Sequence, residues 1–252
     1  MKKKNTNQTD LTTQPYNDNR SDRSPVIPQR SKLKSVLKIY NRELTVRQKE
    51  FLALAADKST KIIFVSGPAG TAKTYLAVLH ALNMLNEKRV SDLIYIRSAV
   101  ECSERSIGLL PGSLDEKIGV YLQPLVDKLE ELLPKNEIEL LKKEERITGM
   151  PISFLRGLNW NAKVIIGDEF QNCTFKEIMT FMTRIGEFSK VFILGDIEQS
   201  DINGRSGLLK AINIFDDEES RANGIFVFKF DETDVVRSGI VKFIIQKIRK
   251  QC

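Results

Sequence analysis

Short apolar runs alternate with longer amphipathic stretches from about Leu44 to the end of the chain. Four of the runs are continuously apolar, which is typical of strands that are covered on both faces of a parallel sheet. A fifth run is interrupted by Lys229, as expected of an edge strand. We therefore predict an α/β fold with a mostly parallel, five-stranded sheet and helices on both faces, with these strands: Ile62–Ser66, Leu93–Arg97, Val164–Asp168, Val191–Asp196 and Ile225–Phe230.

The amphipathic stretches between these runs predict the helices. Thr45 is expected to be the N-cap of a short helix whose apolar side carries Phe51. The stretch 114–143 is also helical in character, but we expect Pro124 and Pro134 to interrupt it, because proline removes a helix hydrogen bond. The remaining predicted helices are Tyr75–Glu87, Phe175–Ile185, Gly207–Phe215 and Asp234–Lys250.

The positive charge of the chain lies at one end. The 252 residues carry a net charge of +6, and residues 1–38 hold nine Lys and Arg against three Asp, so that 39–252 is formally neutral. Residues 1–30 are rich in polar residues and contain three prolines, a composition that predicts disorder. We therefore divide the chain into a basic tail, 1–38, and one domain, 39–252. The tail is interpreted either as a solvated extension without function or as a weak nucleic-acid-binding arm.

Composition excludes several classes of protein. No apolar run approaches the ~18 residues that a transmembrane helix needs, and the polar N-terminus lacks the apolar core of a secretory signal. Cys102, Cys173 and Cys252 lie far apart, which argues against a disulfide scaffold or a zinc site and fits a reducing cytosol. With His80 as the one histidine, there is no Cys/His or Ser/His/Asp machinery, and we expect that side chain to be structural.

The segment after the first predicted strand has the pattern of a phosphate-binding P-loop. It lies between a strand and a helix, the context in which backbone N–H groups can surround phosphates. Lys73 would reach the β- and γ-phosphates of a nucleotide, and the Thr74 hydroxyl would hold Mg²⁺. Ala72 stands where the pattern has a second glycine, at a cost on the order of 1 kcal/mol if its φ is positive. The predicted nucleotide-binding residues of the loop are Gly67, Pro68, Ala69, Gly70, Thr71, Ala72, Lys73 and Thr74.

Two other predicted strands end in polar residues. Asp168 and Glu169 follow a buried strand and would lie at the carboxyl edge of the sheet, where open α/β sheets bind ligands. There Asp168 would hold Mg²⁺ through water and Glu169 would orient or deprotonate the attacking water. Asp196 and Gln199 follow the next strand, and Gln199 could sense the γ-phosphate. The alternative for both pairs is a solvated surface turn. In the chain, the extra strand Leu93–Arg97 between the two nucleotide motifs is typical of ATPases with a separate catalytic glutamate, which favours Glu169 in that role.

Together, the motifs resemble those of the PhoH-like (phosphate-starvation-inducible) ATPase family, which is related to the ATPase core of superfamily-1 helicases. The resemblance extends from about Thr45 to Lys250, and Phe170 and Ser98 depart from it, as does Ala72. The chain is similar to the compact bacterial and phage members, without the PIN domain of longer ones. The resemblance rests on GPAGTAKTYLAV (67–78), IRSAVE (96–101), GLLPGSLDEKIGVYLQPLVD (108–127), RG (156–157), IIGDEFQN (165–172), FMTRIG (181–186), GDIEQSD (195–201) and DVVRSGIV (234–241).

The resemblance implies a RecA-like P-loop NTPase that uses ATP and Mg²⁺ in the cytoplasm and acts on single-stranded RNA or DNA. Gln48 resembles the glutamine that reads the adenine edge in helicase ATPases, although it could equally be a solvated helix residue. Arg97 lies where helicases contact nucleic acid, or else forms a structural ion pair. Gln171 could couple the Asp-Glu pair to bound nucleic acid.

In two-core helicases, the second core brings an arginine to the γ-phosphate, and such an arginine raises the rate of hydrolysis by roughly 10³–10⁵. This chain has only one such core and lacks that arginine. We expect a neighbouring subunit to supply it in a head-to-tail ring, most plausibly a hexamer. Arg237 is the leading candidate, followed by Arg184 and Arg205, and each of them could instead be a surface arginine. The predicted catalytic residues are thus Lys73, Asp168, Glu169, Gln199 and Arg237.

Alternatives to an ATP-driven motor remain. A P-loop phosphotransferase would need a lid rich in arginine, whereas the helical part of 98–150 is acidic. A non-hydrolysing nucleotide-binding scaffold is favoured by Ala72 and opposed by the intact Lys73, Thr74, Asp168 and Glu169. A ribonuclease would need a separate carboxylate cluster, and none is visible. Because the body is neutral, any nucleic-acid contact that it makes must come from local basic patches or from a ring that focuses them.

Overall fold

The computed structural model describes residues 33, 35–98, 114–155, 157–200, 202, 204–236 and 239, and of 114–121 the backbone alone. Most of the predicted last helix therefore lies outside the described residues, as do Cys102, Cys252 and Arg237. Among the helices of the described part, none combines the length and the hydropathy that a membrane span requires.

The sheet has six strands, one more than predicted, and every strand pair in it is parallel. Its order is β3-β2-β4-β5-β1-β6, so that the predicted edge position of the strand containing Lys229 is confirmed. The missed strand, β3, pairs with β2 only and carries Thr148, Gly149 and Pro151 in place of a continuous apolar run. The strands are β1 (Ile62–Ser66), β2 (Asp92–Arg97), β3 (Ile147–Pro151), β4 (Lys163–Asp168), β5 (Lys190–Gly195) and β6 (Ile225–Lys229).

The prediction that Pro124 interrupts its helix is wrong, because α3 continues through it. The lost hydrogen bond is offset by packing, since Leu125, Leu129 and Leu132 of α3 are fully buried. Pro134, in contrast, does separate two helices. The helices are α1 (Val46–Ala56), α2 (Lys73–Asn86), α3 (Leu114–Leu132), α4 (Lys135–Lys143), α5 (Phe175–Met182), α6 (Leu208–Phe215) and α7 (Glu218–Ala222), with 3₁₀ turns η1 (Ile152–Phe154), η2 (Phe170–Asn172) and η3 (Glu232–Asp234).

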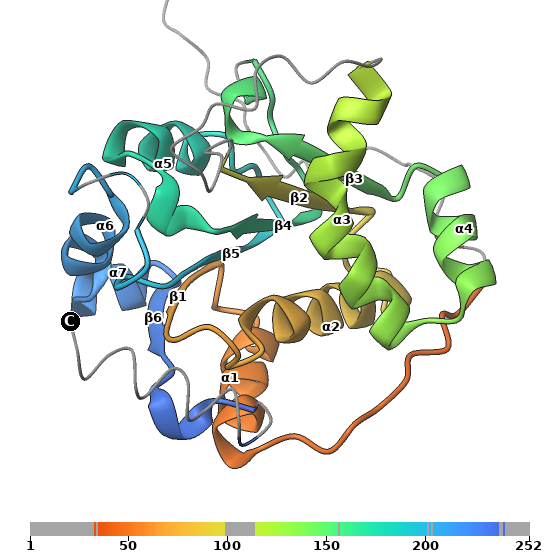
Figure 1. The fold of residues 1–252 in the computed structure, drawn as a ribbon, viewed down its shortest axis with the longest axis horizontal. Coiled ribbons are helices and arrows are strands. Elements are labelled where there is room, and N and C mark those ends of the chain that lie inside the picture. Colours follow the sequence, from red (N-terminus) through yellow and green to blue (C-terminus); the bar gives the residue numbers. More distant parts are fainter. Residues whose placement is uncertain are drawn as a thin grey trace, which may run out of the picture.

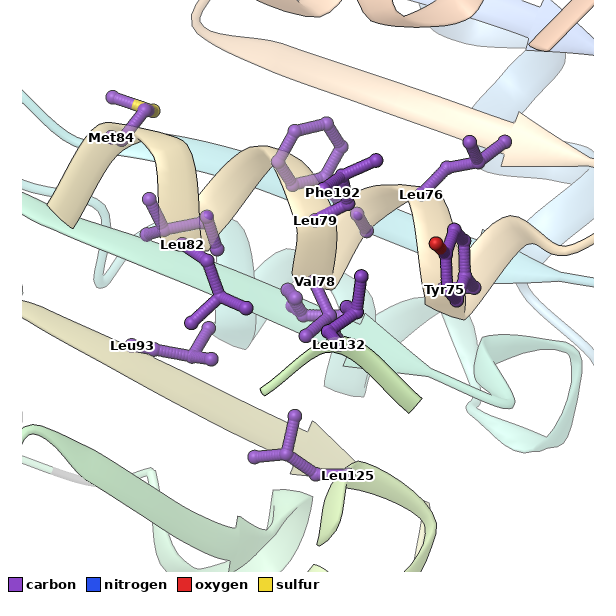
Figure 2. Close-up of a cluster of buried hydrophobic side chains, with 14 of the residues drawn as sticks. Tyr75, Leu76, Val78, Leu79, Leu82, Met84, Leu93, Leu125, Leu132 and Phe192 are labelled. Carbon is purple, nitrogen blue, oxygen red and sulfur yellow. The ribbon is translucent and has the colours of Figure 1, made fainter. Parts of the chain in front are cut away.

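Helices cover both faces of the sheet (Figure 1). Successive residues of a strand point to opposite faces: Ile63 and Val65 join the cluster under α1 to α4, and Ile62 and Phe64 join the cluster under α5 and α6. Figure 2 shows part of the first cluster, to which α2 contributes Leu76, Leu79 and Leu82, β5 contributes Phe192 and α3 contributes Leu125 and Leu132. This burial on both sides explains the continuous apolar runs in the sequence.

The segment before α1 packs against the domain (Figure 1). Leu33 and Leu37 belong to the first core cluster, and the Leu37 backbone exchanges hydrogen bonds with the Asn86 carboxamide at 2.8 and 3.0 Å. The packed part of the chain therefore begins before Leu44, the residue at which the alternating pattern of the sequence starts. The segment 31–40 intersperses apolar residues with lysines and serines over too few positions to predict a packed element.

The carboxyl ends of the parallel strands meet at one edge of the sheet. β5 lies between β1 and β4, so that the ends of these three neighbours bring together the segments at 67–74, 168–169 and 196–199. In space, the strand that separates the two nucleotide motifs is thus β5, whereas the predicted separator β2 lies on the far side of β4.

Candidate nucleotide-binding site

The loop between β1 and α2 combines three residues of positive φ: Gly67 at 152°, Gly70 at 92° and Ala72 at 67°. A Cβ on Gly67 would lie 2.7 Å from the Cβ of Phe230, so that only glycine fits there. Ala72, with φ 67° and ψ 25°, holds the left-handed conformation that a glycine normally supplies. The loop therefore keeps its shape despite the alanine, at the cost that the sequence predicted for a positive φ.

The Lys73 side chain lies along this loop. Its Nζ donates to the carbonyl oxygens of Gly67 at 2.6 Å and Pro68 at 2.9 Å. The Thr71 hydroxyl donates to the same Pro68 oxygen at 3.0 Å. These bonds fix the loop around the lysine ammonium at the N-terminus of α2, where an anion is favoured by the helix dipole and the unpaired N–H groups.

Thr74 and Asp168, which are 94 residues apart in the chain, lie side by side. The Thr74 hydroxyl is 3.2 and 3.1 Å from the two carboxylate oxygens of Asp168. The buried Tyr95 hydroxyl of β2 donates to Oδ2 of Asp168 at 2.6 Å. Burial, followed by the neighbouring Asp168 carboxylate, raises the pKa of Tyr95, so that the phenol stays a donor. These hard oxygen ligands suit Mg²⁺, which is usually held by one or two side chains together with substrate phosphates.

Glu169 extends from the end of β4 in a left-handed backbone conformation, φ 56°. Its carboxylate accepts a hydrogen bond from Nε2 of Gln171 and lies 3.8 Å from the Arg97 guanidinium. Arg97 thus forms the ion pair that was one of its two interpretations. Gln171 also accepts from the backbone N–H of Asp196 at 3.1 Å, which ties the ends of β4 and β5 together.

The turn after β5 is held by Asp196. Its carbonyl accepts from the Gln199 N–H at 3.1 Å, and its Oδ1 accepts from the Glu198 N–H at 3.1 Å. Its Oδ2 is buried and has no hydrogen-bond partner within the described part of the chain. A polar atom of this kind, in the wall of a pocket, is available to a ligand or its water.

These groups surround one cavity of about 360 Å³, to which Arg42, Tyr75 and Lys128 also contribute. The Arg42 guanidinium stacks over the Tyr75 ring at 3.5 Å and lies 3.8 Å from Glu131, which also pairs with Lys128. Of the predicted site residues, the cavity is lined by Ala69, Gly70, Ala72, Lys73, Thr74, Asp168, Glu169 and Gln199.

The other predicted residues lie elsewhere. Gly67, Pro68 and Thr71 shape the loop without lining the cavity. Gln48 is buried, and its Oε1 accepts from the Thr45 N–H in a capping box, while its Nε2 has no partner in the part of the chain described here. It is therefore not the solvated glutamine of the alternative interpretation.

Of the three candidate arginines, the structure describes Arg184 and Arg205. Arg184 lies before β5, at the amino edge of the sheet, and Arg205 donates to the Ile202 carbonyl oxygen at 3.4 Å. Arg237 falls outside the described residues, but the N–H of Val236, directly before it, donates to the Gly70 oxygen at 3.0 Å.

Sequence analysis missed Tyr95, which bonds to Asp168, and these lining residues of the cavity: Arg42, Tyr75, Lys128, Glu131, Gly195 and Val236. Tyr95 left a faint signal, since its hydroxyl interrupts an otherwise apolar run in β2. Arg42 and Lys128 left none, because they reach the cavity from an irregular segment and from the outer face of a helix.

Comparison with known proteins gives the family of this chain. A family model described as "PhoH-like protein" matches residues 41–249. PhoH-like proteins of Mycobacterium tuberculosis strain H37Rv and Bacillus subtilis strain 168 are 40% and 38% identical over 81% and 82% of this chain, and over 56% and 63% of their own lengths. Protein PhoH of Escherichia coli K12 is 32% identical over 74% of this chain and 52% of its own length. The chain thus spans little more than half the length of these curated relatives.

Among solved structures, the Pif1 helicase of Candida albicans matches with a TM-score of 0.34 and 14% identity, over 76% of this chain and 41% of its own. The strand order, with the P-loop after β1 and β5 between β1 and β4, is that of the predicted RecA-like P-loop fold. The P-loop, the strand-end carboxylates and the match over 41–249 agree: the chain belongs to the PhoH-like protein family and contains its P-loop NTPase core.

Proposed function

We propose that this chain binds ATP with Mg²⁺ in the cavity at the carboxyl ends of β1, β4 and β5, and hydrolyses it. The observation that carries the proposal is the pairing of Thr74 with Asp168 at 3.1 to 3.2 Å, directly beside the P-loop lysine. A P-loop threonine and a strand-end aspartate at this distance are the two side chains that hold Mg²⁺ in P-loop NTPases.

Each residue of the cavity has a distinct task in this proposal. Thr74 and Asp168 would hold Mg²⁺, which when bound neutralises charge on the phosphate oxygens. Lys73 would exchange its bonds to the loop carbonyls for bonds to the β- and γ-phosphates. Glu169, kept in place by Gln171, would accept the proton of the attacking water. Gln199, on the turn after β5, would sense the γ-phosphate.

Gln48 does not line the described cavity, but we propose that it reads the adenine base. Its side chain is 1% exposed, and its Nε2 lacks a partner in the described part of the molecule. An unpaired buried amide costs about 1–3 kcal/mol, which a bound base edge could recover. If Gln48→Ala binds ATP more weakly than the wild type but binds a triphosphate without adenine equally well, the assignment is supported.

We further propose that hydrolysis drives movement along single-stranded RNA or DNA. This rests on the family resemblance and on the connection between Arg97, Glu169 and Gln171, which links the strand end of β2 to the water-activating carboxylate. A polymer that contacts Arg97 would release Glu169 from its ion pair and so stimulate hydrolysis.

The active form is proposed to be a ring, most plausibly a hexamer, in which a neighbour supplies the arginine finger. Besides Lys73, the cations in the described lining are Arg42 and Lys128, and both lie against Glu131. That carboxylate reduces their effect on a transition state whose charge spreads over three phosphate oxygens.

Arg237 is the leading finger, and subunit mixing distinguishes a finger in trans from one in cis. Arg237→Ala and Lys73→Ala are each expected to be inactive, whereas their mixture should regain activity, because some sites combine an intact P-loop with an intact Arg237. If Arg237 acts in its own chain, beside Val236 at the loop, the mixture gains nothing.

The test of the whole proposal is ATP hydrolysis with and without single-stranded RNA and DNA, with Lys73→Ala as the control. Hydrolysis that Lys73→Ala abolishes and a polymer stimulates is expected. Hydrolysis without stimulation by either polymer would favour a phosphotransferase, and tight ATP binding without hydrolysis would favour a nucleotide-binding scaffold.

A further inference from the structure

A second hollow lies at the opposite edge of the sheet from the nucleotide cavity, where the strands begin. Its volume is about 1350 Å³. It is formed by the segments that precede β1, β4 and β5, three neighbouring strands, and by the turn after α2. We call it the amino-edge groove, and it is lined by residues 58 and 60–62, 84, 88 and 89, 157–159 and 161, and 183–190.

The charge of the amino-edge groove is strongly unbalanced. Six cationic side chains line it, against the single carboxylate of Glu187. This stands out because the body of the chain, 39–252, is formally neutral. The six cations are Lys58, Lys61, Lys88, Arg89, Arg184 and Lys190.

The lysines at the rim are available to a partner. Lys58, Lys61 and Lys88 are exposed and have no ion pair with any residue that the structure describes. Arg89 is partly neutralised by Glu87 at 3.3 Å. Three unpaired ammonium groups around one hollow are the electrostatic footprint of a polyanion site.

The floor of the groove adds a further positive charge. The buried ammonium of Lys190 donates to the carbonyl oxygens of Ala55 and Asp57. Burial, followed by the Arg89 charge, lowers the pKa of Lys190 to about 8. Burial and the charges of Lys190 and Arg89 likewise lower the pKa of His80 to about 4. Burial is the main cause of both pKa shifts, the Arg89 charge adds to it, and the Asp57 carboxylate opposes it at Lys190.

An aromatic side chain lies among the cations. Phe188 is 54% exposed and lines the groove, although its backbone has φ 59°, a conformation that costs a bulky residue energy. The carboxamides of Asn159 and Asn161 lie in the same lining. The hydroxyl of Thr60, a lining residue that is 1% exposed, has no partner among the described residues.

We propose that the amino-edge groove binds a single-stranded nucleic acid, with phosphates on Lys58, Lys61 and Lys88 and a base stacked on Phe188. A positively charged groove with an exposed aromatic platform is the combination that non-sequence-specific single-strand binders use. The volume exceeds the ≈300–1,000 Å³ of small-molecule pockets, which favours a polymer. An acidic protein segment would need the cations but not the aromatic ring.

This inference rests on the nucleic-acid partner of the proposed function and adds a contact surface for it at the opposite edge of the sheet from Arg97. The groove shares no residue with the nucleotide cavity. Nucleic acid at the beginning of the strands and nucleotide at their ends would be coupled through β5, which contributes Lys190 to the groove and Gly195 to the cavity.

The test is the binding of a fluorescent single-stranded 20-mer, RNA and DNA, to the full chain over a range of salt concentrations. The groove triple variant is Lys58→Ala, Lys61→Ala and Lys88→Ala. The matched control removes three exposed lysines of α4: Lys135→Ala, Lys142→Ala and Lys143→Ala.

The groove triple variant is expected to bind at least about tenfold more weakly at 0.1 M salt, and its log–log salt slope should be shallower by about 2, because each phosphate contact on a single strand contributes about 0.7. The α4 variant should stay within about twofold of the wild type. Phe188→Asn, which tolerates the positive φ, should weaken binding without changing the salt slope, because it removes stacking and no charge. Phe154→Asn, at an equally exposed phenylalanine outside the groove, is its control and should bind normally.

ATP hydrolysis without polymer is measured for every variant, and we expect it to be unchanged. If the wild type binds the 20-mer and the groove triple variant binds it equally well, the inference is overturned while the proposed function stands. If polyglutamate of equal charge competes as well as the 20-mer and Phe188→Asn has no effect, the groove is a surface for an acidic protein and the inference is again overturned. If binding depends on the groove but ATP is not hydrolysed, the inference stands and the proposed ATPase is wrong.

Discussion

Ala72 lies in the left-handed region, φ 67°, directly before the lysine of the P-loop. The left-handed conformation brings Cβ too close to the following carbonyl oxygen, which costs an L-residue other than glycine about 1–2 kcal/mol. This strain is stored in the loop that is proposed to hold the phosphates. Its cost is small enough that a chain without the usual second glycine can still form the loop.

Ala72→Gly should therefore stabilise the protein by about 1 kcal/mol, because it removes the strain at a position that glycine adopts freely. The urea midpoint in the absence of nucleotide measures this, with an unchanged m-value. Gly70→Ala, the reverse exchange at φ 92° in the same loop, should lower the midpoint. A lower midpoint for Ala72→Gly would contradict the account.

His80, the only histidine in the chain, is buried in α2 against Phe192. Burial, with the charges of Lys190 and Arg89, lowers its pKa from 6.5 to about 4. The unfolded chain therefore takes up this proton near pH 6.5 and the folded chain only near pH 4. The stability associated with His80 is complete above about pH 6.5 and is lost progressively as the pH falls toward 4.

Wild-type protein should lose about 2 kcal/mol of its unfolding free energy through His80 between pH 7.5 and pH 5. In His80→Leu and His80→Gln, which cannot titrate, this part of the loss should vanish, whatever either exchange costs at pH 7.5. Urea unfolding at the two pH values gives the comparison. Equal pH dependence in all three proteins would show that the folded-state pKa is not depressed.

At the scale of elements, the 3₁₀ turn η2 connects the ends of β4 and β5. Gln171 in this turn donates to the Glu169 carboxylate after β4 and accepts from the Asp196 N–H after β5. The packing leaves little freedom, since a Cβ on Gly195 would lie 2.9 Å from Oε1 of Gln171. In the proposed mechanism, Gln171 is thus a positioning residue that acts through Glu169.

Gln171→Glu tests this role by a change of charge without a change of shape. A second carboxylate beside Glu169 raises the pKa of the proposed base, so the acid limb of the pH profile of kcat/KM should shift to higher pH. kcat at neutral pH should fall about tenfold to a hundredfold. Gln123→Glu, the same exchange on the exposed face of α3, should leave the profile unchanged. A purely structural Gln171 would lower kcat without moving the acid limb.

The elements that the sequence predicts well are those whose pattern is local. The five continuous or edge-like strands and the Thr45-capped helix appear as expected, because burial on both faces and a capping box act over a few residues. β3 was missed, since an edge strand containing glycine and proline has no such pattern. The helix through Pro124 was misjudged, because tertiary packing of its leucines overrides a local propensity.

In the candidate site, too, the residues that the sequence predicts are those that belong to a local motif. The P-loop and the carboxylates at the strand ends are contiguous motifs, and the structure brings them together. Tyr95 and Arg42 come from segments with no motif of their own, and only the strand order and the packing of the segment before α1 bring them to Asp168 and Tyr75. Such residues become visible only when the topology is known.

At the scale of the whole molecule, the basic segment at the start of the chain overlaps the folded domain. The net charge of +6 resides in residues 1–38. Within that range Leu33 and Leu37 are 5% and 3% exposed and belong to the core. A truncation at residue 38 would therefore remove packing together with charge, and a truncation at residue 32 would remove seven Lys and Arg and three Asp but neither leucine.

Removing 1–32 should leave the urea midpoint and basal ATP hydrolysis unchanged while it weakens polynucleotide binding and flattens its salt dependence. Removing 1–38 should in addition lower the unfolding free energy by about 3–5 kcal/mol, because two buried leucine side chains are lost from the core under α2. Leu33→Ala with Leu37→Ala in the full chain should reproduce the loss of stability without the loss of binding. If both truncations are equally stable, the packing of this segment contributes nothing to the fold. If the 1–32 truncation binds the polymer with an unchanged salt slope, all of the phosphate contacts belong to the domain.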